Sequence, residues 1–138
     1  MIGELSYFLG LQITQCSEGL FISQKKYLKE MLKKFQTEDS SPISTPMNVG
    51  CKLRKYDISR DVDQRTYRSK IGSLLYITAS RPYIMHAVGM VGIFQSAPKQ
   101  IHLVIVKRIF KYLKGTLYLG LWYPCSDKIK LEVYIDAY

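Results

Sequence analysis

Cysteine and histidine are scarce in this sequence, and their positions argue against two common kinds of small domain. The three cysteines, Cys16, Cys51 and Cys125, are widely separated and form no CxxC pair. The two histidines, His86 and His102, do not stand at zinc-ligand spacing from any of them. We therefore expect neither a structural zinc site nor a disulfide framework, and we expect reduced thiols.

Long apolar runs are also missing. Residues 82–98 contain no Asp, Glu, Lys or Arg, but this stretch is shorter than the ~20 residues of a membrane-spanning helix. It also contains two prolines, two glycines and a histidine. Residues 1–6 show no basic region ahead of an apolar run, so no secretory signal is visible. We expect a buried helix at 82–98, no membrane partner, and an intracellular protein of the cytoplasm or nucleus.

Acidic residues are few in the middle of the chain. Residues 51–120 hold 13 basic and 3 acidic side chains, whereas residues 1–50 hold five of each sign. This middle section accounts for the net charge of +9. Such a charge distribution indicates a polyanionic partner, either nucleic acid or an anionic membrane surface, unless it only keeps the protein soluble.

The pattern of apolar residues predicts an α+β fold. Residues 5–14 and 20–22 are strand-like and are separated by a turn at 17–19, which indicates an N-terminal β-hairpin. Apolar residues at helical spacing follow Ser23, which can cap the first helix. Polar residues 37–63 form a long connection. Three further helices are expected at 64–78, from Ser80-Arg81-Pro82 to about Gln95, and from Ser96-Ala97-Pro98 to Lys114. In the last two, Ser80 and Ser96 are the expected caps, each two residues before a proline that fits the first turn. A terminal β pair is expected at 117–123 and 130–135.

The last expected helix has two distinct faces. Leu103, Val106, Phe110 and Leu113 recur at helical spacing and should face inward. A second face is basic and is formed by Lys107, Arg108, Lys111 and Lys114. A basic stripe of this kind either contacts nucleic-acid phosphates or is only a solvated helix face.

Six segments, in order along the chain, resemble motifs of Ty1/copia-type retrotransposon reverse transcriptases. Residues 3–13 resemble the family segment GELSFFLGLQI, and residues 67–76 resemble YRxxIGSLLY. The other four segments are residues 80–85, similar to SRPDI, residues 106–116, similar to KRIxRYLKGT, residues 119–123, similar to LGLxY, and residues 134–137, similar to the start of YSDADWAG. No single motif is decisive, but the ordered set covers nearly the whole chain.

The resemblance implies roles for particular residues. Phe8, Leu9 and Gly10 would belong to the primer grip, where the missing side chain of Gly10 would let a nucleic-acid backbone approach closely. The later helices would form the thumb and connection, with Lys107, Arg108, Lys111 and Lys114 on phosphates. The implied partners are an RNA/DNA or DNA duplex, bound without sequence preference, and the rest of the polyprotein. No small-molecule substrate is implied.

The resemblance also implies that catalytic groups are missing. Asp136 matches the first metal-binding aspartate of RNase H, but that chemistry needs two Mg²⁺ ions held by several carboxylates. The Tyr-x-Asp-Asp strand of the polymerase is absent from the chain. Mg²⁺ would therefore belong to the intact parent enzyme, and no cofactor is expected here. The chain departs from the family pattern at Tyr83, Gly89, Gly92, Ile93 and Tyr138, which suggests a decaying element.

Together these observations predict a four-part organisation. The expected parts are a primer-grip-like hairpin with the first helix (1–36), a connecting loop (37–63), thumb-like helices (64–116) and the truncated start of an RNase H-like domain (117–138). The predicted role is non-catalytic gripping of a primer–template duplex by a polyprotein fragment that is not an enzyme on its own. Three alternatives remain: a nucleic-acid-binding module recruited by the host, a secreted effector-like or membrane-associated protein, and a remnant without function. The absence of an Arg-x-Leu-Arg motif counts against the second.

Overall fold

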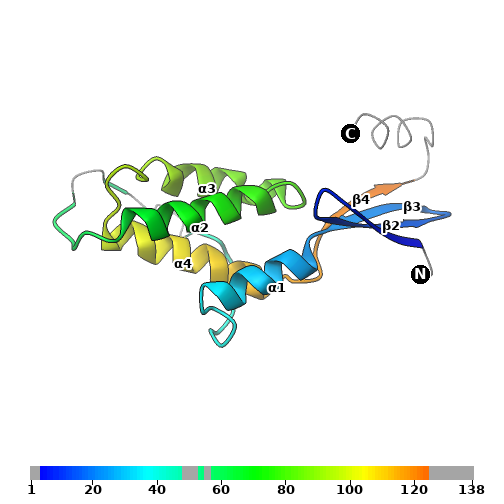
Figure 1. The fold of residues 1–138 in the computed structure, drawn as a ribbon, viewed down its shortest axis with the longest axis horizontal. Helices are drawn as coiled ribbons and strands as arrows, with labels where there is room; N and C mark the ends of the chain where they lie inside the picture. Colours follow the sequence, from blue (N-terminus) through cyan, green and yellow to red (C-terminus); the bar gives the residue numbers. More distant parts are fainter. Residues whose placement is uncertain (1–3, 48–52, 55–56, 125–138) are drawn as a thin grey trace.

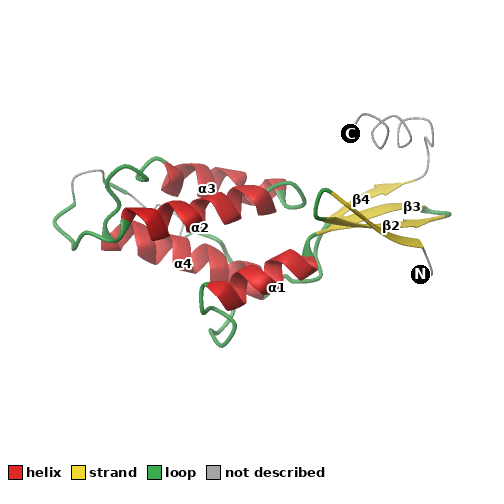
Figure 2. Cartoon of the chain, viewed as in Figure 1, coloured by secondary structure: helices red, strands yellow, loops and turns green. Residues whose placement is uncertain are grey.

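The chain forms a group of helices and a small sheet, and the sheet lies at one end of the helices (Figure 1). The computed structural model describes residues 4–47, 53–54 and 57–124. Figure 2 shows the strands gathered at one end of an elongated molecule and the helices at the other. In chain order the elements are β1 (Glu4–Phe8), β2 (Leu11–Cys16), β3 (Gly19–Ser23), α1 (Lys25–Lys34), α2 (Gln64–Ile77), the 3-10 helix η1 (Pro82–Ile84), α3 (Met85–Gly92), α4 (Gln100–Lys114) and β4 (Leu121–Pro124). The predicted α+β class is confirmed.

The sheet is antiparallel with strand order β1-β2-β3-β4. The strand expected at 5–14 is interrupted by a two-residue turn, because Phe8 pairs with Leu11 across Leu9 and Gly10. Both turn residues have positive φ, 52° at Leu9 and 80° at Gly10, as in the type I′ turns of tight hairpins. A leucine gives no sequence signal for such a turn, because this conformation costs a non-glycine residue roughly 1–2 kcal/mol.

The last described strand returns to the N-terminal sheet. The strand expected at 117–123 begins only at Leu121, and β4 pairs with β3, where Trp122 lies opposite Phe21. Gly120 permits this approach, because a Cβ at that position would collide with the backbone carbonyl of Ile22. The expected partner strand at 130–135 lies outside the described residues.

The hydrophobic core lies among the four helices. Val106, Phe110 and Leu113 of α4 are buried as predicted, and Leu103 is half-buried. The expected buried helix in residues 82–98 is present as η1 and α3, but α3 ends at Gly92. The other core side chains are Leu28, Met31 and Leu32 of α1, Tyr67, Ile71, Leu74 and Ile77 of α2, Ile84, Ala87, Val88 and Val91 of η1 and α3, and Ile105 and Ile109 of α4. Within the described residues, no helix has the length and apolar character needed to cross a membrane.

Tertiary partners replace the three expected serine caps. Ser80 does not cap the helix that begins at Pro82, because its hydroxyl donates to Oε1 of Gln24. Ser23 does not cap α1; instead the backbone N–H of Lys26 donates to Oε1 of Gln12 in β2 at 2.9 Å. Ser96 does not cap α4, which begins at Gln100 with Lys99 as its cap residue. There the backbone N–H of Gln100 donates to the backbone oxygen of Arg60 at 2.8 Å, while that of Lys99 donates to Nδ1 of the nearby His102 at 2.9 Å. Residues close in sequence were outcompeted by partners that the folded chain brings near.

Buried polar side chains join the elements. Gln24, between β3 and α1, donates to the backbone oxygen of Tyr76 at 3.0 Å and accepts from the hydroxyl of Ser80 at 2.6 Å. Arg81 is buried, and its guanidinium donates to the hydroxyl and backbone oxygen of Thr116 and to the backbone oxygen of Leu119. The guanidinium therefore anchors the segment that leads from α4 back to the sheet.

Candidate nucleic-acid interface

The four basic residues predicted on α4 do not form one free surface. The guanidinium of Arg108 donates to the hydroxyl of Thr45 at 2.8 Å, and the ammonium group of Lys114 donates to the backbone oxygen of Ser40. The backbone oxygen of Lys111 accepts a hydrogen bond from Ile43. Residues 40–45 of the connecting loop therefore lie along α4 and use two of the four cations as anchors. Lys107 remains exposed.

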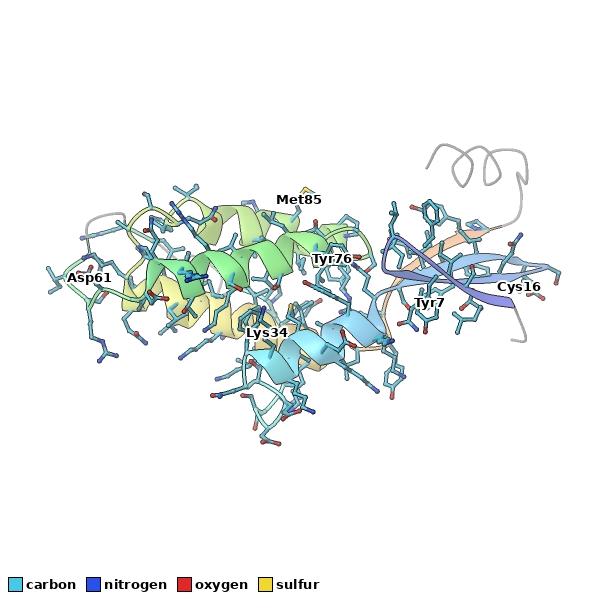
Figure 3. The ribbon with its side chains drawn as sticks, in the orientation of Figure 1. Tyr7, Cys16, Lys34, Asp61, Tyr76 and Met85 are labelled. Atoms are coloured by element: carbon cyan, nitrogen blue, oxygen red, sulfur yellow. The ribbon has the colours of Figure 1, made fainter. Side chains whose placement is uncertain are left out.

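Lys107 lies close to a basic residue of another helix. The pKa of Lys70 in α2 is lowered from the ordinary lysine value, first by burial of its ammonium group and second by the positive charge of Lys107. The ammonium nitrogen of Lys70 also lies 5.8 Å from the ring centroid of Phe35, and that of Lys34 lies 5.2 Å from the same centroid. Figure 3 places Lys34 where α1 meets α2 and α4.

Lys34, Lys70 and Lys107 thus form a cluster of cations from three helices, which we call the lysine cluster. Its floor is aromatic, because Phe35 stacks on Phe110 of the core with ring centroids 5.4 Å apart. The C-terminal end of α1 is therefore held against α4 by buried aromatic area and not by attraction between charges.

The lysine cluster has an excess of positive charge. In the described part of the chain, Lys99–Asp61 is the single salt bridge. No described carboxylate therefore lies within salt-bridge distance of a lysine in the cluster. Lys70 is half-buried, so it loses hydration while its neighbour repels it. A phosphate placed beside these groups would relieve both effects, because it offers opposite charge and strong acceptor oxygens. Geometry and charge together favour an anion at this position.

The predicted hairpin residues lie at the other end of α1. Leu9 is 68% exposed at the tip of the β1–β2 turn, and Phe8 is half-buried beside it. The structure gives a different reason for Gly10 than the one expected from sequence, because a Cβ there would collide with the hydroxyl of Tyr76 in α2. The space above Gly10 is filled by this protein side chain. The primer-grip assignment itself stays a prediction.

Asp136, the predicted remnant of an RNase H site, lies outside the described residues. Within the residues that are described, no three His, Cys, Asp or Glu side chains lie close enough together to hold a metal ion. Lys34 and Lys70 were missed as candidate residues. No local pattern could identify them, because the three members of the cluster come from segments separated by about 36 residues each.

Comparison with known proteins gives consistent relatives. Over 97% of its length the chain is 35% identical to the Retrovirus-related Pol polyprotein from transposon RE1 of Arabidopsis thaliana, of which it spans 9%. Over 99% of its length it is 36% identical to the corresponding polyprotein from transposon TNT 1-94 of Nicotiana tabacum, of which it spans 11%. An uncharacterized mitochondrial protein of Arabidopsis thaliana is 34% identical, and the chain spans 56% of it. No family model and no solved structure matches the chain.

Proposed function

We propose that this chain, which is homologous over nearly its whole length to one segment of retrotransposon Pol polyproteins, holds a nucleic-acid duplex without reading its sequence. The observation that carries the proposal is the lysine cluster. Its three cations come from three helices: Lys34 and Lys70 lie over the ring of Phe35, and the charge of Lys107 acts on Lys70. Among the described residues, none of the three has a carboxylate within salt-bridge distance. Lysines that contact phosphates position a duplex and carry no sequence information.

The finer role follows from the arrangement of the cluster and the hairpin. They lie at opposite ends of α1 (Lys25–Lys34), which is about 15 Å long at 1.5 Å per residue. This length corresponds to roughly four nucleotides at 3.4 Å spacing. In this proposal the cluster binds backbone phosphates a few nucleotides away from a primer terminus, and the turn at Leu9 lies beside that terminus. This is the arrangement expected of a thumb and primer grip.

Duplex binding should depend strongly on salt. Each neutralised phosphate releases condensed counterions, so three contacts predict a log–log slope of roughly −3 on B-DNA. Fluorescence anisotropy with one labelled duplex at several salt concentrations measures the slope. A second duplex of scrambled sequence should give the same affinity, because phosphate contacts are shared by all sequences. Binding that is independent of salt, or that differs tenfold between the two duplexes, would contradict the proposal.

We further propose that the chain performs no catalysis on its own. DNA synthesis on a primed RNA template should be undetectable with Mg²⁺ or Mn²⁺, as should RNase H cleavage of an RNA/DNA hybrid. The reason is that two-metal chemistry requires several converging carboxylates, and the chain contains no Asp-Asp pair. A longer relative that includes the Tyr-x-Asp-Asp strand serves as the positive control. Metal-dependent primer extension that is lost on Asp136→Asn would show that the proposal is wrong.

A further inference from the structure

The orientation of the sheet relative to the helices is not set by hydrophobic packing. Among the described residues, the core cluster between the helices contains no residue of β1, β2, β3 or β4. Ile13 and Leu20 of the sheet are buried, but outside that cluster. The covalent links between the parts are short, since Gln24 alone separates β3 from α1 and residues 115–120 lead from α4 back to β4. The angle between sheet and helices must therefore depend on a few contacts at the junction.

In the described part of the chain, Arg81 anchors the link between α4 and β4, and the side chains of Gln12, Gln24 and Tyr76 make hydrogen bonds on the other side of this junction. Gln12 accepts from the backbone of Lys26, and Gln24 bonds to the C-terminal end of α2. Both of these contacts lie close to the link between β3 and α1, where they fix the connection itself. The third contact lies further away. The hydroxyl of Tyr76 in α2 donates to the backbone oxygen of Leu9, in the turn between β1 and β2, at 2.5 Å.

Tyr76 is held in place on both sides. Its ring contacts the ring of Tyr27 in α1, with centroids 4.5 Å apart and planes inclined at 55°. Its hydroxyl lies directly over Gly10, where any side chain would collide with it. Figure 3 shows Tyr76 at the end of α2 that faces the sheet. The contact between Tyr76 and Leu9 lies farther from the link between β3 and α1 than the contacts of Gln12 and Gln24. It therefore acts with a longer lever arm and restrains the angle of the hairpin more strongly.

The turn that Tyr76 contacts holds an exposed leucine in a costly backbone conformation. Leu9 has φ of 52° and its side chain is 68% exposed. A non-glycine residue keeps this conformation only when its surroundings determine it. The hydrogen bond to the carbonyl oxygen of Leu9 supplies such a constraint, and it fixes the direction in which the leucine side chain projects.

We propose that Tyr76 is a positioning residue that sets the angle of the β1–β2 hairpin and thereby places Leu9 at the terminus of the bound duplex. The second half of this statement rests on the duplex-binding function proposed above. The first half concerns the protein alone and can be tested without nucleic acid. Tyr76 acts here through the hairpin and does not itself contact the duplex.

Spin-label distances in the free protein test the first half. One label is attached at Gln15→Cys on β2 and the other at Arg68→Cys on α2, both exposed positions, in a chain whose natural cysteines are changed to serine. The parent should give one narrow distance distribution. Tyr76→Phe keeps the ring contact with Tyr27 but loses the hydrogen bond, so the ratio of displaced to docked hairpin should rise roughly threefold to tenfold.

Two further variants make this result specific. Gly10→Ala places a methyl group against the Tyr76 hydroxyl and should broaden the distribution in the same way, with little further change in the double variant. Tyr123→Phe removes a hydroxyl from an exposed tyrosine of β4 and should leave the distribution unchanged. An unchanged distribution in folded Tyr76→Phe, or equal broadening in Tyr123→Phe, would overturn the positioning role.

Photocrosslinking tests the second half. A benzophenone amino acid replaces Leu9, and the protein is bound to a duplex with one recessed end. Crosslinks should concentrate on the terminal nucleotides, and Tyr76→Phe should reduce this terminal yield by about threefold or more while duplex affinity changes less than about twofold. Uniform crosslinks along the duplex in the parent would overturn the placement of Leu9. Failure to bind any duplex would reject the proposed function, while the spin-label result would still decide the role of Tyr76.

Discussion

Arg81→Met is expected to lower the free energy of unfolding by about 3 kcal/mol, because hydrogen bonds to a charged group contribute roughly 1.5–3 kcal/mol each and are not additive. Arg81 is 1% exposed, and its guanidinium donates to Thr116 and to the backbone oxygen of Leu119. The pKa of this guanidinium is lowered by burial, yet an arginine stays protonated, so the buried cation depends on these acceptors. Methionine fills similar volume but leaves the acceptors without a donor.

Urea unfolding followed by circular dichroism measures this loss. Arg81→Lys should recover only part of it, because an ammonium group lacks the planar fork that reaches two acceptors at once. Arg68→Met, on the exposed face of α2, is the matched control and should change stability by less than about 0.5 kcal/mol. Equal stability of Arg81→Met and Arg68→Met would mean that the guanidinium does not anchor the segment after α4.

Phe110→Ala should destabilise the chain by about 4 kcal/mol, the usual cost of removing a buried phenylalanine side chain. Phe110 is 1% exposed and stacks on Phe35, which forms the floor of the lysine cluster. We therefore expect a second effect: protein that remains folded should bind duplex more weakly, because Phe35 loses its support.

The same unfolding experiment, combined with duplex binding at a temperature where the variant is folded, measures both effects. Val104→Ala, on the exposed side of α4, is the control and should change neither quantity. A folded Phe110→Ala variant with unchanged duplex affinity would show that the stacking of Phe35 on Phe110 is not needed for duplex binding.

Local sequence patterns were sufficient to predict that helices α1 to α4 exist, although α3 ends earlier and α4 begins later than expected. In α4 the apolar residues recur every three or four positions, and Val106, Phe110 and Leu113 are buried as that spacing requires. The end of α4 at Lys114 before Gly115 was also predicted correctly. Such features depend on residues within a few turns of each other, so the sequence carries them directly.

Features made by distant residues were not predictable. Arg81 was expected only beside a helix cap, but its acceptors at Thr116 and Leu119 lie 35 and 38 residues further along the chain. The turn at Leu9 lacks the usual Asn-Gly signal, and its partner Tyr76 is 67 residues away. The lysine cluster has the same origin, because each of its members comes from a different helix.

One comparison tests the central claim, that the lysine cluster holds the duplex, most directly. In the first variant Lys34, Lys70 and Lys107 are changed to Gln, and in the second the exposed residues Lys29, Arg65 and Arg68 are changed to Gln. Both variants lose the same charge, so a general attraction between a basic protein and a polyanion would affect them equally. Salt titrations on one duplex should show that the first variant flattens the log–log slope by roughly 3 and the second by less than about 1. Equal slopes for the two variants would contradict the account.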